Sequence, residues 1–423
     1  MASTSPRNWA GNITFRAARQ HRPSSVDELR RIVADAEHVR ALGTGHSFNR
    51  IADTDGDLVR LDGLPRRIDV DPASSTVTVS AGLRYAQLAE HLHARGHALA
   101  NLASLPQISV AGACTTATHG SGNGRQNLAA AVAAVRLVGP DGGLTELRRE
   151  NPQDRLDGAV VALGALGIVT DVTLDVEPTY EVAQWVYTGL SGDRLTENFE
   201  EISGAAYSVS VFTDWASDDN QVWLKRRTDR EDPGHLGRTW LGARCADRPL
   251  HPIPGISPAH CTEQLGVPGP WHERLPHFRP DFTPSSGAEL QSELILPRTA
   301  AAEAFEALRR LGHRIAPVLQ TAEIRTIAAD DLWLSPAHRQ DSVALHFTWI
   351  EQAAAVLPVI EAVEAVLVPL GARPHWGKLT TLAPGTLAGR YERAADFRQL
   401  MLDHDPAGKL RNAFVSEVFP DLG

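Results

Sequence analysis

The N-terminal part of the chain combines a helical apolar pattern with a short strand. Apolar residues at 29, 32, 33 and 36 recur at helical spacing after Ser25-Val26-Asp27-Glu28, in which Ser25 and Glu28 can cap each other's free amides. Residues 39–42 predict a strand. This strand leads into the glycine-rich turn Gly43-Thr44-Gly45-His46-Ser47-Phe48, at a strand end where α/β proteins tend to place ligand contacts.

The pattern up to residue 178 predicts an α+β unit. Residues 67–71 and 76–80 alternate apolar and polar side chains around a turn, which is typical of a hairpin with one buried face. Apolar positions between 85 and 92 predict a helix that ends at Gly96. Alternation from 168 to 176 predicts a strand that stops near Pro178.

A second domain is predicted beyond residue 178. Long strand-like stretches are followed by a proline-rich irregular segment over 249–284 and by a helix over 300–314. The tail predicts a helix over 390–402 and a turn-rich segment over 405–414. Because the 423 residues exceed the roughly 100–200 of a single domain, two domains are expected on length as well.

Charge and composition limit the classes of partner. The net charge is −10 and the basic residues are scattered, so the sequence has no basic cluster that would bind nucleic acid or an anionic membrane. The first residues lack a basic and an apolar leader region, and no uninterrupted apolar run reaches the roughly 18 residues that span a bilayer. We expect a cytoplasmic monomer that acts on a small neutral substrate.

Cysteine and histidine spacing argues against a metal site. Cys114, Cys245 and Cys261 are odd in number and widely spaced, which supports neither a disulfide framework nor a zinc site. His91 and His93 would point to nearly opposite sides of a helix and cannot share an ion. No metal is expected.

Two glycine-rich segments could hold an anionic cofactor. In the turn over 43–47, glycines free the backbone so that successive amides can converge on a pyrophosphate, although a bare turn of this kind is more often structural. The small residues over 103–122 also permit close backbone approach. Gly120-Ser121-Gly122-Asn123-Gly124 does not predict NAD binding, because no strand runs into it and no acidic residue follows about 20 positions on.

Two further segments predict polar sheet faces. Thr321, Glu323 and Arg325 alternate with apolar residues, and so do His346 and Thr348, so each set shares one face if its segment is a strand. Side by side these strands would make a polar platform. From these residues alone, a solvated face with a cross-strand ion pair is about as good an interpretation as a binding site. A lone lysine such as Lys378 is usually a surface charge.

The chain resembles the alditol oxidases, sugar-alcohol oxidases within the vanillyl-alcohol-oxidase type of FAD-linked oxidases. The resemblance runs nearly end to end and includes Gly43–Phe48, Glu323-Ile324-Arg325-Thr326 and Pro374-His375-Trp376-Gly377-Lys378. It implies an α+β fold of the PCMH type, in which an FAD-binding domain is made from residues 1–178 and 376–423. A mixed-sheet substrate domain over 179–375 lies between these parts.

The resemblance also assigns the cofactor site. It implies FAD bound covalently, through a link from His46 to the 8α-methyl carbon of the flavin; Cys114 is not read as a second attachment. The implied cofactor contacts are Ala41, Leu42, Gly43, Thr44, Gly45, His46, Ser47, Ser104, Ser109, Gly112, Thr116, Ala117, Thr118, His119, Val169 and Asn412.

The implied substrate site lies on the polar strand faces. Ser104, Glu323, Arg325, His346, Thr348 and Lys378 would bind an alditol such as xylitol or sorbitol. The implied reaction oxidises the terminal primary hydroxyl to the aldose and reduces O₂ to hydrogen peroxide, with Arg325 and Lys378 stabilising the developing alkoxide and Lys378 or His346 taking the proton. Alternatives are an aldonolactone dehydrogenase of the same fold and a non-catalytic carrier.

Overall fold

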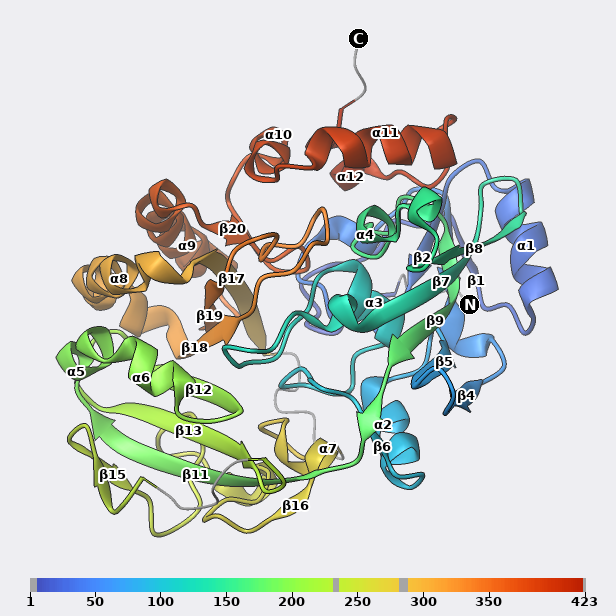
Figure 1. The fold of residues 1–423 in the computed structure, drawn as a ribbon. Helices are drawn as coiled ribbons and strands as arrows, with labels where there is room; N and C mark the ends of the chain where they lie inside the picture. The colour runs from blue at the N-terminus through green and yellow to red at the C-terminus, as the bar shows by residue number, and fades with distance from the viewer. Residues whose placement is uncertain (1–5, 231–235, 281–287, 421–423) are drawn as a thin grey trace.

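The structure is a computed structural model that describes residues 6–230, 236–280 and 288–420. The outer ends of the predicted domains, 1–5 and 421–423, and the end of the predicted irregular segment, 281–284, lie outside the described residues. Figure 1 shows two units side by side, with the C-terminal segment lying across the N-terminal one.

The N-terminal unit contains two main sheets among the described residues. A parallel sheet has the order β1 (Arg19–His21), β3 (Asp57–Arg60), β2 (Val39–Leu42). An antiparallel sheet has the order β4 (Ile68–Asp71), β5 (Thr76–Ser80), β9 (Ile168–Asp175), β7 (Val132–Val138), β8 (Leu144–Arg148). The predicted hairpin is therefore confirmed as β4 and β5. A short pair of β6 (His97–Ala98) with β10 (Glu177–Pro178) ends the unit.

Short helices pack around these sheets. They are α1 (Val26–Asp35), α2 (Tyr85–His93), α3 (Val110–Thr115) and α4 (Leu156–Ala159). The predicted cap of α1 is confirmed in part. The Ser25 hydroxyl accepts a hydrogen bond from the Glu28 amide at 3.2 Å, but the Glu28 carboxylate accepts from the amide and hydroxyl of Ser24 rather than from the Ser25 amide.

The second unit is built on one large sheet. In the described chain its order is β14 (Thr239–Trp240), β15 (Ala243–Cys245), β11 (Glu181–Leu190), β13 (Asn220–Arg227), β12 (Ser208–Thr213), β18 (Leu319–Ile327), β19 (Ser342–Ile350), β17 (Glu289–Pro297) and β20 (Arg373–Pro374), with β16 (Gly269–Pro270) beside β11. A mixed sheet was expected, but the ladders between these described strands are antiparallel. In the pair of β12 and β13 a short connection joins consecutive strands, which an antiparallel pair permits and a parallel pair does not. The described parallel contact at this sheet is an isolated bridge between Ser292 and Leu379.

Helices cover one face of this sheet (Figure 1). They are α5 (Gly192–Glu197), α6 (Phe199–Gly204), α8 (Ala301–Ile315) and α9 (Ala353–Leu367), while α7 (Trp271–Arg274) packs near α2. Ile324 and Leu345 share a buried core with residues of α8 and α9. Successive side chains of a strand point to opposite faces of the sheet. The polar residues that alternate with these apolar ones on β18 and β19 therefore face the N-terminal unit.

Helix α9 and the turn that continues it, Ala353–Leu370, are long and apolar enough to cross a membrane by length and composition, with a mean hydropathy of 2.0. The prediction of no spanning segment rested on uninterrupted apolar runs, and Glu361 and Glu364 interrupt this one. Val356, Ile360 and Val363 pack into the core of the large sheet, which gives the apolar face of the helix a place inside the fold.

The C-terminal tail packs on the N-terminal unit. It comprises α10 (Pro384–Leu387), α11 (Ala394–His404) and α12 (Ala413–Val418), and α11 contacts α4. Buried Arg40 on β2 joins the two, because its guanidinium donates to the carbonyls of Ile51, Leu163, Gly164 and Leu410 at 2.5–3.0 Å. One side chain thus ties a strand and two loops of the N-terminal part to the tail.

Replacing Arg40 by Met should destabilise the protein strongly. The change leaves four carbonyl groups without their donor in a buried setting, and each such loss costs about 1–3 kcal/mol, so a total of about 3 kcal/mol or more is expected. Arg16→Met, which breaks an ion pair of a mostly exposed arginine with Asp53, should cost about 1 kcal/mol or less. Denaturant unfolding of both variants measures the difference; equal effects would contradict the role of Arg40.

Candidate active site

A cavity of about 270 Å³ lies between the two units. Its lining comes from the turn after β2, from the segment that leads into α3, from the loop before β9 and from the polar face of the large sheet. Residues separated by more than 300 positions in the sequence therefore meet in one site.

The turn over 43–47 forms one wall of the cavity. Gly45 adopts a positive φ of 70°, which favours glycine, and a Cβ on Gly43 would lie 2.3 Å from the Ser109 hydroxyl oxygen. The Ser109 amide donates to the Thr44 hydroxyl at 3.2 Å. The two glycines thus allow the turn to lie directly against the N-terminus of α3.

His46 lines the cavity, and one of its two ring nitrogens has no hydrogen-bond partner among the described residues. Its Nδ1 lies 3.0 Å from the Thr44 hydroxyl and its ring stacks on Trp9 at a centroid distance of 5.0 Å. Its Nε2 is shielded from solvent and has no hydrogen-bond partner among the described residues. Burial lowers the pKa of His46 to about 4, so the imidazole is neutral and keeps a lone pair.

These features fit a bound FAD. Backbone amides at a glycine-rich turn and at the adjoining segment suit a diphosphate, and the unpartnered Nε2 of His46 is the kind of buried polar atom that a ligand completes. Gly43–Ser47, Ser109, Gly112, Thr116 and Thr118 are the residues that would hold the cofactor.

Lys378 reaches this wall because its segment is hydrogen-bonded to the turn. The Phe48 amide donates to the Gly377 carbonyl at 2.7 Å, and the Asn49 side chain donates to the carbonyls of Trp376 and Lys378 at 2.8 and 3.0 Å. The segment that contains Lys378 is therefore fixed against the residues that follow His46.

Three strands of the large sheet place acidic and basic groups in a row at the cavity. Glu293 on β17 pairs in register with His346 on β19, which pairs with Glu323 on β18. Arg325 follows two positions along β18 and shares the face of Glu323. Arg325 and Glu323 are 6% and 5% exposed, so this face lines a buried cavity and is not solvated.

Glu293 joins the cationic groups of this row. Its Oε1 accepts from Arg325 Nη2 at 2.5 Å and its Oε2 accepts from Lys378 Nζ at 2.7 Å. Lys378 Nζ also lies 2.7 Å from Nδ1 of His346, and Arg325 Nε lies 3.6 Å from Oε2 of Glu323. The two candidate bases, Lys378 and His346, therefore contact each other.

The protonation states follow from burial and from these contacts. Burial alone would raise the pKa of Glu293, but Lys378 and Arg325 hold it well below its usual range, and Arg325 and His277 act likewise on Glu323. Burial lowers the pKa of Lys378, and Glu293 opposes that shift. Burial, assisted by Lys378, lowers the pKa of His346 to about 3, so this ring is neutral.

Most of the sequence-predicted site residues line the cavity. They are Ala41, Leu42, Gly43, Thr44, Gly45, His46, Ser47, Ser104, Ser109, Gly112, Thr116, Thr118, His119, Val169, Glu323, Arg325, His346 and Lys378. The structure thus brings together the glycine-rich segments and both polar strands.

Three predicted residues lie outside the lining. Thr348 stands behind His346, with its hydroxyl 3.2 Å from Nε2 of that ring. Ala117 is buried in the hydrophobic core, at a positive φ of 53°. Asn412 caps α12 through the Val415 amide and donates to the carbonyls of Ile51 and Asp53. Thr348 therefore contacts a residue of the lining, whereas Ala117 belongs to the core and Asn412 to the cap of α12.

Sequence reasoning missed several residues of the site. Gln291 and Glu293 lie two positions apart on β17 and line the cavity, but polar Ser292 stands between them, so the clean alternation that marked β18 and β19 is missing from this strand. His375 lines the cavity, and Trp9 both lines it and stacks on His46. His277, whose Nε2 lies 2.8 Å from Oε1 of Glu323, belongs to an irregular segment that has no periodicity to reveal it.

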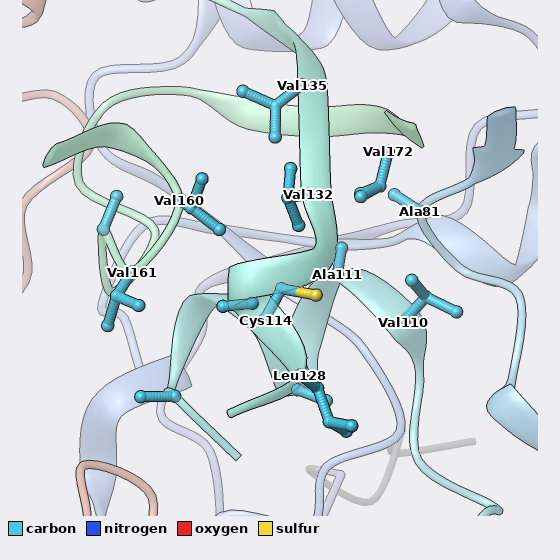
Figure 2. Close-up of a cluster of buried hydrophobic side chains, with 14 of the residues drawn as sticks. Ala81, Val110, Ala111, Cys114, Leu128, Val132, Val135, Val160, Val161 and Val172 are labelled. Atoms are coloured by element: carbon cyan, nitrogen blue, oxygen red, sulfur yellow. The ribbon is translucent and has the colours of Figure 1, made fainter. Parts of the chain in front are cut away.

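Cys114 is a core residue. Figure 2 shows it among Val110, Val132 and Val160, and it is outside the residues that line the cavity. Burial raises the pKa of the thiol to about 11, which leaves it protonated and unreactive. This agrees with the expectation that it is not a second flavin attachment.

Known proteins resemble the chain along nearly its whole length. Residues 18–148 match a family described as FAD binding domain, and residues 289–418 match one described as D-arabinono-1,4-lactone oxidase. The chain is 52% identical to alditol oxidase of a Streptomyces species, over 98% of this chain and 99% of that protein. It is 28% identical to L-gulono-1,4-lactone dehydrogenase of Mycobacterium tuberculosis, over 97% of this chain and 98% of that protein.

Solved structures resemble it in fold. Cholesterol oxidase from B. sterolicum superposes with a TM-score of 0.76 at 14% identity, over 99% of this chain and 97% of that chain. The fold is therefore the two-domain FAD-binding fold that the sequence predicted. By its full-length identity the chain belongs to the alditol oxidase family, among the FAD-linked oxidases of the vanillyl-alcohol-oxidase type.

Proposed function

We propose that the protein oxidises the terminal primary hydroxyl of alditols, such as xylitol and sorbitol, to the aldose and reduces O₂ to hydrogen peroxide. The observation that carries this proposal is the buried row of Glu293, His346, Glu323, Arg325 and Lys378, which faces the same cavity as the glycine-rich turn. Its closely spaced hydrogen-bond donors and acceptors suit a neutral substrate rich in hydroxyl groups.

FAD, when bound, supplies the acceptor for the hydride and delivers the electrons to O₂. The chain's own residues have to bind the alditol, orient it and remove the hydroxyl proton. Ionised Glu323 can accept hydrogen bonds from substrate hydroxyls, and Arg325 can donate them. An analogue that lacks those hydroxyls leaves buried polar groups unpaired, which is how such a site discriminates.

Lys378 is the base that the geometry favours. A neutral amine has two hydrogens, and Nζ has two acceptors in place, Oε2 of Glu293 and Nδ1 of His346. Its lone pair is then left for a substrate hydroxyl in the cavity that Lys378 lines. In this arrangement Nδ1 of His346 is the acceptor for a hydrogen of Lys378, which suits His346 to orienting the amine and leaves the first proton to Lys378.

We also propose that FAD is attached covalently through His46. The support is the position of the ring at the cavity, its neutral state and its unpartnered Nε2. A tether at this point would keep the cofactor against the substrate-binding row. Location in the cytoplasm, the monomeric state and the absence of a membrane segment stay predictions.

The His46→Ala variant should lose the tether. After acid precipitation the wild-type polypeptide should keep its flavin fluorescence in a denaturing gel, whereas the variant should release the flavin to the supernatant. His313→Ala, at an exposed position on α8, is the matched control and should behave as wild type. Flavin that stays with the His46→Ala chain would contradict the assignment.

A further inference from the structure

Two buried polar residues lie behind Glu323, outside the cavity lining: His277 contacts Glu323, and Lys225 contacts His277. Lys225 on β13 is 1% exposed, and His277, in the segment after α7, is 3% exposed. Neither residue lines the cavity that Glu323 faces, and neither is needed for the reaction as described above. Burying a lysine and a histidine costs free energy unless both are paired, so the presence of these two side chains in the interior needs a structural or functional explanation.

The surroundings of Lys225 fix which nitrogen of His277 carries a proton. The ammonium group has three donors and no acceptor. Three acceptors surround it: the Leu275 carbonyl, the Pro276 carbonyl at 3.1 Å and Nδ1 of His277 at 3.3 Å. Burial lowers the pKa of Lys225 to about 7, and in its ammonium form Lys225 can only donate, which requires Nδ1 of His277 to accept. Ionised Glu323 on the other side of the ring can only accept, so both neighbours favour the tautomer whose proton lies on Nε2.

The Nε2–H group of His277 is aimed at Glu323. It lies 2.8 Å from Oε1 of that carboxylate, and the Ser210 hydroxyl lies 3.4 Å from the same nitrogen. Phe212 and Trp223 confine the ring in T-shaped contacts, at centroid distances of 5.2 and 5.5 Å. Burial, with a contribution from Lys225, lowers the pKa of His277 to about 4, which agrees with a neutral ring.

One oxygen of Glu323 is therefore engaged, and the rotation of its carboxylate is fixed. The other oxygen is 3.6 Å from Arg325 Nε, and the residue lines the cavity. An ionised acceptor held in one orientation makes a strong hydrogen bond with a hydroxyl at one place only, and it is costly to leave unpaired.

We propose that Lys225 and His277 are positioning residues that make Glu323 a fixed acceptor for substrate hydroxyls away from the reacting carbon. Lys225 sets the tautomer of His277, and His277 sets the orientation of Glu323. The pair thereby determines the preference for polyols over simple primary alcohols. This inference rests on the proposed function, since it names the device by which the same site would recognise its substrate.

The tautomer is tested by nuclear magnetic resonance of the holoenzyme with ¹⁵N-labelled histidine. The signals of His277 are identified by their absence in His277→Gln. We expect the wild-type ring as the neutral Nε2–H form, and Lys225→Met, which keeps the length of the stem but lacks donors, to shift the ring toward a mixture of tautomers. A wild-type His277 protonated on Nδ1 would overturn the proposal whether or not the enzyme oxidises alditols.

The consequence for selectivity is tested by kinetics with xylitol and with 1-butanol, which lacks the distal hydroxyls. His277→Leu and Lys225→Met should raise KM for xylitol roughly 10-fold or more, with a smaller change in kcat, because a hydrogen bond to a charged group is lost. Their kcat/KM for 1-butanol should stay near wild type. His277→Gln, whose amide can donate near the position of Nε2, should recover most of the affinity for xylitol.

The controls separate positioning from damage to the core. Cys261→Ala removes a buried side chain that is an electrostatic neighbour of Lys225 and should leave the ratio of the two substrates unchanged. Equal losses for xylitol and 1-butanol in His277→Leu, or no recovery in His277→Gln, would overturn the proposal. If the proposed function is wrong, no alditol will reduce the flavin of the wild-type enzyme. The NMR experiment would still report the tautomer of His277 in that case, so the two failures can be told apart.

Discussion

Replacing Lys378 by Met should lower the rate of flavin reduction by xylitol roughly 10²–10⁴-fold, the usual contribution of a positioned acid or base. The amine of Lys378 is buried, its two acceptors are Glu293 and His346, and it lines the cavity. Methionine fills similar space without a lone pair of comparable basicity. Anaerobic stopped-flow measurement of flavin bleaching gives the rate directly, without a contribution from the reaction with O₂.

Lys378→Arg separates the base from a simple positive charge. Arginine stays protonated at neutral pH, so it should not restore flavin reduction if Lys378 takes the proton. The wild-type rate should rise with pH through the lowered pKa of Lys378, because only the neutral amine is a base. Near wild-type reduction in either variant would sink the proposed role.

The Glu293→Gln variant should show the second large effect, on stability and on pH dependence together. Removing one partner from a buried ion pair leaves Lys378 without its carboxylate and Arg325 with Glu323 alone, and such a loss costs about 3–5 kcal/mol. Glu146→Gln, at a partly exposed ion pair with Arg136 and Arg148, should cost about 1 kcal/mol or less. Thermal or denaturant unfolding compares the two variants.

The sign of the pH effect follows from the groups around Lys378. Glu293 raises the pKa of Lys378 against the larger effect of burial. Its removal should therefore move the rise of flavin reduction to lower pH. Since the pKa of Glu293 itself is depressed, its stabilising contribution is present at neutral pH and is lost as the pH falls through that value. An unchanged pH profile would show that Glu293 does not act on the base.

The local patterns of the sequence predicted those parts of the fold that depend on neighbouring residues. The hairpin of β4 and β5, the helix α8 and the alternation on β18 follow from apolar periodicity, because one face of each has to be buried. The pairing of β17 with β19, which places Glu293 beside His346, joins segments about 50 residues apart, and no local signal reports it. The antiparallel ladders of the large sheet were missed for the same reason.

The candidate site was predictable to the extent that it follows local patterns or resembles a known family. His46 and Lys378 were single polar residues whose own segments favoured a structural or surface interpretation. The structure brings them together through the hydrogen bonds of Phe48 and Asn49 to the segment over 376–378. Tertiary contacts of this kind cannot be predicted from the spacing of residues along the sequence. His277 shows the same limit, since an irregular segment gives no periodicity from which to infer its contact with Glu323.

Oxygen consumption by the purified yellow protein shows whether it oxidises alditols at the expense of O₂. With xylitol in an oxygen electrode, we predict rapid uptake of O₂ with formation of hydrogen peroxide, and bleaching of the flavin when O₂ is absent. Reduction of an artificial dye by an aldonolactone, with no O₂ uptake on any alditol, would contradict the account and would identify a dehydrogenase instead.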